Sequence, residues 1–181
     1  MRKRLALATT LALSLSGCGY NTFQTTDEQV KAGWAEVINQ YQRRADLIPN
    51  LVETVKGYAA QEKDIFTEVT RLRSQWGQAQ TVNEKVENSN AMTSALSRLL
   101  LVAENYPQLK SNENFLALQS ELEGTENRIA VERMRYNNAA QALNAFQRSF
   151  WGRFFTGQTG VKEAVYFKAP EAAHEVPKVS F

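Results

Sequence analysis

Apolar residues recur at alternating intervals of three and four residues through most of the chain, which is the spacing of an amphipathic helix. From Trp34 to Trp76, thirteen positions follow a heptad pattern, and eleven of them are apolar. A seam sustained over this many heptads is typical of long helices packed side by side. The thirteen positions are Trp34, Val37, Tyr41, Arg44, Ile48, Leu51, Val55, Tyr58, Glu62, Ile65, Val69, Leu72 and Trp76.

Pro49 lies inside this seam, where proline removes a backbone N–H and kinks a helix. The heptad phase is nevertheless the same before and after it, whereas a loop would usually shift that phase. The pattern therefore predicts one kinked helix from about Asp27 to about Gln78, roughly 75 Å long at 1.5 Å per residue. Two helices that meet near Pro49 are the alternative.

Two further helices follow a turn at residues 77–83. The first runs from about Asn83 to Asn105 and ends before Pro107, because the residue before a proline is pushed out of the helical region. The second can be capped by Ser111 or Asn112. It has a seam of eleven positions, nine of them apolar: Phe115, Leu118, Leu122, Thr125, Ile129, Glu132, Tyr136, Ala139, Leu143, Phe146 and Phe150. Gly124 is unfavourable inside a helix, so we expect it to mark close helix packing.

These elements predict an all-α fold, an elongated antiparallel helical bundle over residues 27–150 with a short irregular tail. The tail, residues 151–181, is rich in aromatic residues and has a short alternating pattern at residues 161–167. The aromatic cluster of residues 150–155 either folds back over the bundle or enters a membrane interface. The apolar end, residues 179–181, is either a frayed terminus or a segment that a groove-type domain captures.

The first eighteen residues have the pattern of an export signal. A basic start, Arg2 to Arg4, precedes an apolar run from Leu5 to Leu15 that is too short to span a membrane as a helix. The run ends in Leu-Ser-Gly-Cys at residues 15–18, which resembles the lipobox of bacterial lipoproteins. We therefore expect residues 1–17 to be a signal peptide and Cys18 to be lipidated. An ordinary cleaved signal and an uncleaved short anchor are the alternatives.

Lipidation at Cys18 would make residues 18–26 a lipidated tether and the membrane the first partner. Each buried methylene contributes about 0.8 kcal/mol, so two or three acyl chains on one residue anchor a protein stably. By resemblance to lipoproteins of Gram-negative bacteria, Gly19 after the cysteine implies release to the outer membrane, facing the periplasm. The inner membrane is the alternative.

The composition excludes most kinds of catalytic chemistry. The chain has one cysteine and one histidine, His174, so we expect neither disulfides nor a multi-cysteine metal site. Acidic residues such as Glu121, Glu123 and Glu126 lack the helical histidines that di-iron bundles use, and a catalytic triad lacks its imidazole. We expect no cofactor and no metal.

The charge distribution argues against nucleic acid as a partner. Removal of residues 1–17 takes three of the 21 basic residues and none of the 19 acidic ones, so the formal net charge changes from +2 to −1. The remaining acidic and basic residues are interleaved, as on a solvated helix face.

Four polar residues fall on the apolar seams and are candidates for buried or interacting groups: Arg44, Glu62, Thr125 and Glu132. An unpaired buried charge costs several kcal/mol, so inward-facing charges need partners. We expect Arg44 to pair with Glu132 or Glu62. Such pairs can fix helix register or leave their long side chains at the surface; a polar ligand pocket is the alternative.

Five blocks of the chain resemble the signature of the bacterial LemA family and keep its order. They are RRADLIPNLVETVKGY at 43–58, AENYPQLK at 103–110, NFLALQ at 114–119, EGTENRI at 123–129 and YN at 136–137. The resemblance implies a helical bundle that is held to the membrane at its N-terminus and lies on the extracytoplasmic side. Many members have a membrane-spanning N-terminal helix where this chain has a lipobox.

No enzymatic activity is established for the family, which agrees with the missing imidazole and thiol chemistry. We therefore expect a non-catalytic envelope scaffold that interacts with other envelope proteins. A sensor for a small ligand or peptide, built from the buried polar residues, is the alternative. The sequence does not determine the oligomeric state.

Overall fold

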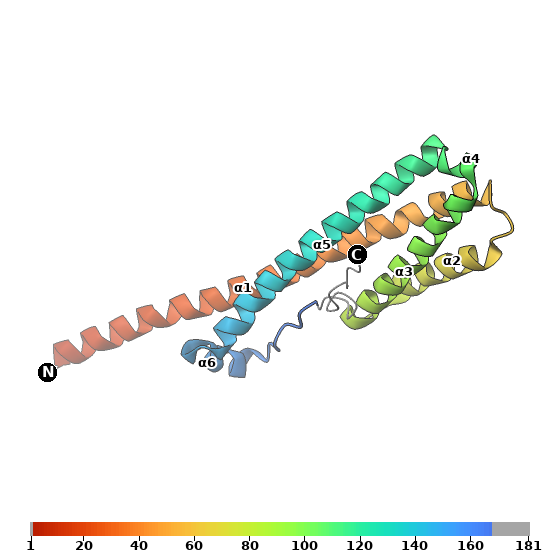
Figure 1. The fold of residues 1–181 in the computed structure, drawn as a ribbon. Helices are drawn as coiled ribbons and strands as arrows, with labels where there is room; N and C mark the ends of the chain where they lie inside the picture. The colour runs from red at the N-terminus through yellow and green to blue at the C-terminus, as the bar shows by residue number, and fades with distance from the viewer. Residues whose placement is uncertain (1, 168–181) are drawn as a thin grey trace, which may run out of the picture. The chain divides into compact units, whose positions relative to one another are not determined.

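The computed structural model describes the backbone of residues 2–167 and the side chains of residues 19–150 and 152–167. The thiol of Cys18, the side chains of residues 1–17 and the chain end at 179–181 therefore lie outside the described residues. Every regular element of the described backbone is a helix, which confirms the all-α prediction (Figure 1). The elements are α1 (Arg2–Lys56), α2 (Lys63–Gln78), α3 (Val82–Val102), η1 (Ala103–Asn105), α4 (Pro107–Lys110), α5 (Glu113–Arg148) and α6 (Phe150–Thr159).

The chain divides into two compact units. The first combines residues 1–37 with residues 131–181, and the second consists of residues 38–130. Both α1 and α5 contribute one part to each unit. Over the described residues, no helix is both long enough and apolar enough to cross a membrane.

The predicted single helix from Asp27 to Gln78 is wrong, and so is the alternative of a break near Pro49. Helix α1 continues through Pro49 and ends at Lys56, and α2 starts at Lys63. Six residues separate the two helices, so the first residue of α2 comes seven positions after the last residue of α1. This interval is one heptad, and the phase of the heptad seam is therefore the same in both helices. The two seam positions within the connection do not belong to the core: Tyr58 is 40% exposed and Glu62 is only partly buried.

A side chain from α2 compensates for the proline inside α1. Pro49 has no N–H, so the carbonyl of Ala45 one turn earlier lacks its usual helical donor. The Nε–H of Arg73 donates to that carbonyl oxygen at an N···O distance of 2.9 Å. Ala45 itself is 2% exposed. The orphaned carbonyl is thus satisfied by a hydrogen bond between helices, which explains how α1 continues past the proline.

The core of the second unit is built from the seams of its helices. Figure 1 shows α2 and α3 running side by side in opposite directions. The ring of Tyr41 in α1 meets that of Trp76 in α2 edge to face, with 6.5 Å between centroids. The fully buried large side chains of this unit are Tyr41, Ile48, Leu51, Val55, Met92, Leu99, Leu109, Phe115 and Ile129.

Local hydrogen bonds start α3 and α5 where the sequence indicates. Thr81 and Glu84 form a reciprocal capping box at the start of α3. Asn112 caps α5, because its Oδ1 accepts from the N–H of Phe115 at 3.0 Å. The expectation for Gly124 is wrong: a Cβ placed there would meet no atom within 4 Å, so helix packing does not require a glycine.

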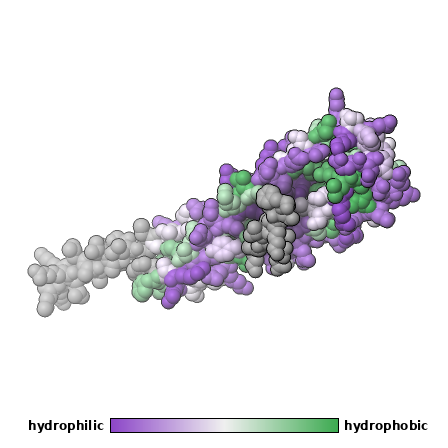
Figure 2. Space-filling model, in the orientation of Figure 1, coloured by the Kyte–Doolittle hydropathy of each residue, from purple (hydrophilic) through white to green (hydrophobic). Residues whose placement is uncertain are grey.

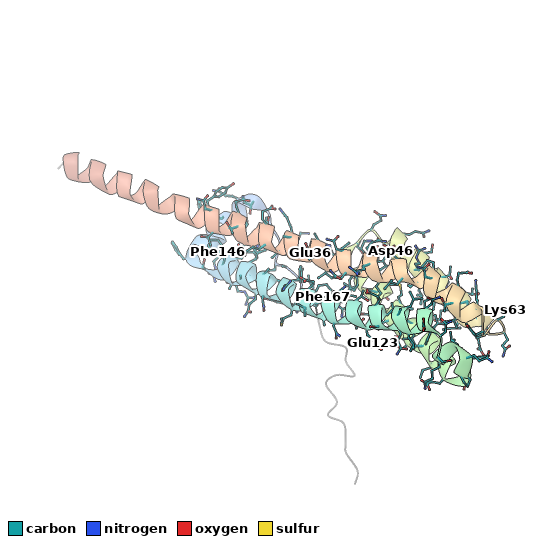
Figure 3. All side chains as sticks on the ribbon, turned by 90° about the horizontal axis from the view of Figure 1, so that it is seen from above. Glu36, Asp46, Lys63, Glu123, Phe146 and Phe167 are labelled. Carbon is teal, nitrogen blue, oxygen red and sulfur yellow. The ribbon has the colours of Figure 1, made fainter. Side chains whose placement is uncertain are left out.

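In the first unit, α1 and α5 lie side by side (Figure 3). The two helices approach closely at Gly33. A Cβ at Gly33 would lie 3.3 Å from the Cα of Tyr136, tighter than ordinary side-chain contacts. Phe23, within the segment expected to be a tether, is 1% exposed and packs against Phe146. Residues 19–26 are therefore part of α1 and contribute to this core.

The chain after α5 is more regular than the loss of heptad periodicity predicts. Ser149 caps α6 by accepting from the N–H of Gly152 at 3.1 Å. At Gly152 a Cβ would fall 1.7 Å from the carbonyl oxygen of Phe146, so only glycine fits. Helix α6 ends at Thr159 and is capped by Gly160, which has a φ of 67°. Phe155 of the aromatic cluster folds back onto Tyr20, whereas Phe154 is 59% exposed.

Residues 161–167, hereafter the tail segment, follow α6 without forming helix or strand. Their burial does not alternate as the sequence pattern predicts. Val161, Ala164 and Phe167 are partly buried, and the four residues between them are exposed. A repeat of three is typical of a polyproline-like extended chain rather than a strand.

Candidate functional site

Arg44 is the most buried charged side chain among the four polar seam residues. Its side chain is 5% exposed, and its guanidinium forms an ion pair with the carboxylate of Glu126, which is 46% exposed. The pair joins α1 to α5 within the second unit. The prediction that Arg44 pairs with Glu62 or Glu132 is therefore wrong. Glu126 lies next to the seam position Thr125, so its longer side chain reaches Arg44 from the edge of the helix face.

Thr125 and Glu62 also have local partners in the second unit. The hydroxyl of Thr125 is buried and donates to the carbonyl oxygen of Leu122 at 2.8 Å. Glu62 accepts a hydrogen bond from the hydroxyl of Tyr106 at 3.3 Å, and that hydroxyl accepts from Gln61. Desolvation, and then the charge of Glu62, raise the pKa of Tyr106.

Glu132 belongs to the first unit and pairs with its helical neighbour Arg135 at 2.7 Å. Its carboxylate side chain is 13% exposed, whereas that of Arg135 is 66% exposed. Each of the four candidates has a partner close by: Arg44 and Glu62 bond to other elements, and Thr125 and Glu132 bond to their own helix.

Two hollows on the second unit are lined by other residues. The larger, about 900 Å³, runs along α2 and the end of α1. The smaller, about 580 Å³, lies between α3 and α5 beside the exposed Leu101 and Leu116. Figure 2 shows hydrophobic side chains gathered over α3 on the face drawn. None of Arg44, Glu62 and Glu132 lines either hollow.

The tail segment is held by side-chain amides of α5 that the sequence analysis did not single out. Asn144 donates to the carbonyl oxygen of Ala164 at 2.9 Å and accepts from the N–H of the same residue at 2.8 Å. Asn137 makes the same pair of bonds with Phe167, at 3.0 and 2.9 Å. Each asparagine thus satisfies both main-chain groups of one tail residue.

Two more residues of α5 complete this set. Tyr136 donates its hydroxyl to the carbonyl oxygen of Val165 at 3.0 Å, and Gln147 donates to that of Val161 at 3.3 Å. Burial raises the pKa of Tyr136. We call Tyr136, Asn137, Asn144 and Gln147 the cradle.

An aromatic contact fixes the end of the tail segment. The ring of Phe167 stacks on Trp34 with 5.7 Å between centroids and meets Tyr136 edge to face at 5.1 Å. The guanidinium carbon of Arg133 lies 5.3 Å from the centroid of Phe167, as in a cation–π contact. Figure 3 labels Phe167 between the ribbons of α1 and α5.

A second stripe on α5 could have indicated the cradle. Asn137, Ala140, Asn144 and Gln147 follow the same spacing of three and four as the apolar seam beside them. Asn144 is 2% exposed and Gln147 is 6% exposed. Buried amides at heptad spacing need hydrogen-bond partners, so this stripe indicates that polar groups pack against this face of α5.

The described side chains offer no obvious metal centre. Among them, no three or more histidine, cysteine or carboxylate groups lie close enough together to hold an ion.

Comparison with known proteins places most of the chain in one sequence family. The model of the LemA family matches residues 33–181. Over 130 residues the chain is 25% identical to the protein LemA of Metamycoplasma hominis. The aligned region covers 71% of this chain and 59% of that protein.

The similar proteins include magnetosome proteins. The chain is 27% identical over 179 residues to the magnetosome protein MamQ 2 of Paramagnetospirillum magneticum, covering 84% of this chain and 66% of that protein. It is 25% identical over 184 residues to the magnetosome protein MamQ of Magnetospirillum gryphiswaldense, covering 87% and 65%. The chain therefore spans just under two thirds of the length of these relatives.

Proposed function

The chain belongs to the LemA family, and from this premise we propose that it is a lipid-anchored envelope protein that binds other polypeptides and catalyses no reaction. The lipid on Cys18 holds it at the extracytoplasmic side of a membrane. We place it at the outer membrane, facing the periplasm.

The anchor is supported by the sequence around the single cysteine. Residues 15–18 read Leu-Ser-Gly-Cys after a basic start and an apolar run, and the chain has no other cysteine. A thiol at this position is what lipid attachment requires. Two or three acyl chains on one residue give stable attachment, whereas one chain binds reversibly.

The observation that carries the binding role is the cradle. Asn137 and Asn144 each donate to and accept from the main chain of the tail segment. The first unit thus contains groups arranged to hold an extended polypeptide, which is the chemistry of an interaction protein.

The alternative of a sensor for a small ligand, built on the polar seam residues, has less support. Arg44 and Glu126 are bonded to each other, and Thr125 is bonded to its own helix. A ligand site would need convergent polar groups lining a cavity.

Crosslinking in living cells tests this proposal. A photoreactive amino acid placed at exposed positions of α5 should capture specific envelope proteins when the chain has its anchor. The Cys18→Ser variant should remain folded, carry no lipid, fail to reach the outer membrane and lose those products. Capture of no protein from any position, in cells where the wild-type chain is folded and membrane-bound, would contradict the binding role.

A further inference from the structure

We propose that the cradle is a binding site for an extended segment of another protein, and that the tail segment occupies it as an internal ligand. This inference rests on the proposed binding role and names the class of partner. The partner's segment has the pattern of the tail segment: an apolar residue, a small residue three positions later and an aromatic residue three positions after that.

Recognition in the cradle is directed at main-chain atoms. The four hydrogen bonds made by Asn137 and Asn144 go to the N–H and C=O groups of Ala164 and Phe167. Tyr136 and Gln147 add bonds to two further carbonyl oxygens. Every peptide has these groups, so the cradle can hold an extended chain of a different sequence.

The spacing of the asparagines matches an extended chain. Asn137 and Asn144 are seven residues apart on α5, which corresponds to about 10.5 Å of helix. Their tail partners, Phe167 and Ala164, are three residues apart, which corresponds to about 9–10 Å of extended chain. Both asparagines can therefore bond the main chain of an extended ligand without distortion. A helical ligand would advance only about 4.5 Å over three residues and could not reach both.

Side-chain selection is confined to the three tail positions that face the helix. Phe167 fits between Trp34, Tyr136 and Arg133. Ala164 is partly buried beside Asn144, which bonds both of its main-chain groups. By contrast, Val165 is 68% exposed, so the positions between accept many residues.

The tail segment is attached in a way that permits exchange. It follows Gly160, whose φ of 67° a glycine adopts without steric cost. The buried Asn144 and Gln147 require hydrogen-bond partners whether or not the tail supplies them. Because the tail is part of the same chain, its effective concentration is high, so a partner segment competes with it.

A synthetic peptide provides the probe. Its sequence is that of residues 160–167, GVKEAVYF, with a fluorescent label, and it is titrated into the purified full chain. A chain variant with Ala164→Pro and Phe167→Ala weakens the internal ligand, because proline has no N–H to donate to Asn144. We expect this released-tail variant to bind the peptide at least tenfold more tightly than wild type.

Two controls make the result specific. A peptide with proline at the position of Ala164 should bind the released-tail variant at least tenfold more weakly than GVKEAVYF. Adding Asn137→Ala to that variant should likewise weaken binding of GVKEAVYF at least tenfold, with thermal unfolding used to show that the helices remain folded. Asn137 is partly exposed, so this change removes its amide without opening the core.

The outcomes separate this inference from the proposed function. Equal peptide binding by wild type and the released-tail variant, with rapid amide exchange at residue 167 proving release, would overturn the site. If wild-type chains dimerise, with the tail segment of each chain bound in the cradle of the other, the partner is a second copy of this chain. That result would overturn the proposal that the partner is a different protein. The titration needs no membrane, so its failure leaves the crosslinking test of envelope binding intact.

Discussion

The guanidinium of Arg73 donates a hydrogen bond to the carbonyl oxygen of Ala45, the acceptor that Pro49 leaves without its helical donor. A buried carbonyl without a partner costs about 1–3 kcal/mol. The contact therefore couples the position of α2 to the proline in α1. It explains why a helix with an internal proline remains continuous at this point.

Replacement of Arg73 by Met should destabilise the chain by about 1–3 kcal/mol, because the Ala45 carbonyl loses its donor. In a Pro49→Ala background the restored N–H can bond the same carbonyl, so the Arg73→Met substitution should cost less. Urea denaturation of the four proteins measures this coupling. An equal cost in both backgrounds would show that Arg73 does not act through the orphaned carbonyl.

The ion pair between Arg44 and Glu126 should respond differently to the loss of each partner. Without Glu126, the charge of Arg44 stays buried, whereas without Arg44 the half-exposed carboxylate of Glu126 can be hydrated. We expect Glu126→Ala to cost about 1–2 kcal/mol and Arg44→Met to cost less, measured by chemical denaturation. A larger loss for Arg44→Met would contradict this account of the pair.

Two helical glycines, Gly124 inside α5 and Gly152 in the first turn of α6, should respond in opposite directions to alanine. Gly124→Ala places a methyl group in open space and should stabilise the chain by about 0.5–1 kcal/mol. Gly152→Ala places it against the Phe146 carbonyl and should destabilise the chain by about 1–3 kcal/mol. Thermal unfolding of the two variants beside wild type measures both effects, and the same sign for both would contradict the packing described.

Burial of Tyr136 should make the first unit sensitive to alkaline pH. The folded-state pKa is raised by burial, so folding favours the neutral hydroxyl that donates to Val165. The stabilisation is complete below the unfolded pKa of about 10 and is lost as the pH rises through the folded pKa. The difference in unfolding temperature between wild type and Tyr136→Phe should therefore shrink above pH 10. A difference that is constant from pH 8 to 11.5 would contradict this role.

The heptad pattern predicted which helix faces are buried but not where α1 ends. Ile48 and Val55 lie in the core as expected. The break after Lys56 escaped prediction because six connecting residues preserve the phase of the seam. Hydrophobic periodicity predicts which face of a helix is buried. A connection that spans one full heptad does not change this periodicity, so the pattern does not reveal where the helix ends.

The partners of polar residues were harder to predict than their burial. Arg44 is buried, as its seam position implies, but it bonds to Glu126, which lies off the seam. Side chains of this length reach across more than one helical position, so a search limited to seam residues missed the partner. Asn137 and Asn144 were missed for the same reason, since they lie on the stripe beside the seam.

The placement of the chain depends on the chemistry at Cys18, and mass spectrometry of the protein extracted from the membrane tests it most directly. We predict that the mature chain begins at Cys18 and that its N-terminal peptide carries the mass of a diacylglyceryl group and a further acyl chain. The Cys18→Ser variant should retain residues 1–17 and carry no lipid. A wild-type chain that retains residues 1–17, or that begins at an unmodified residue, would contradict the account.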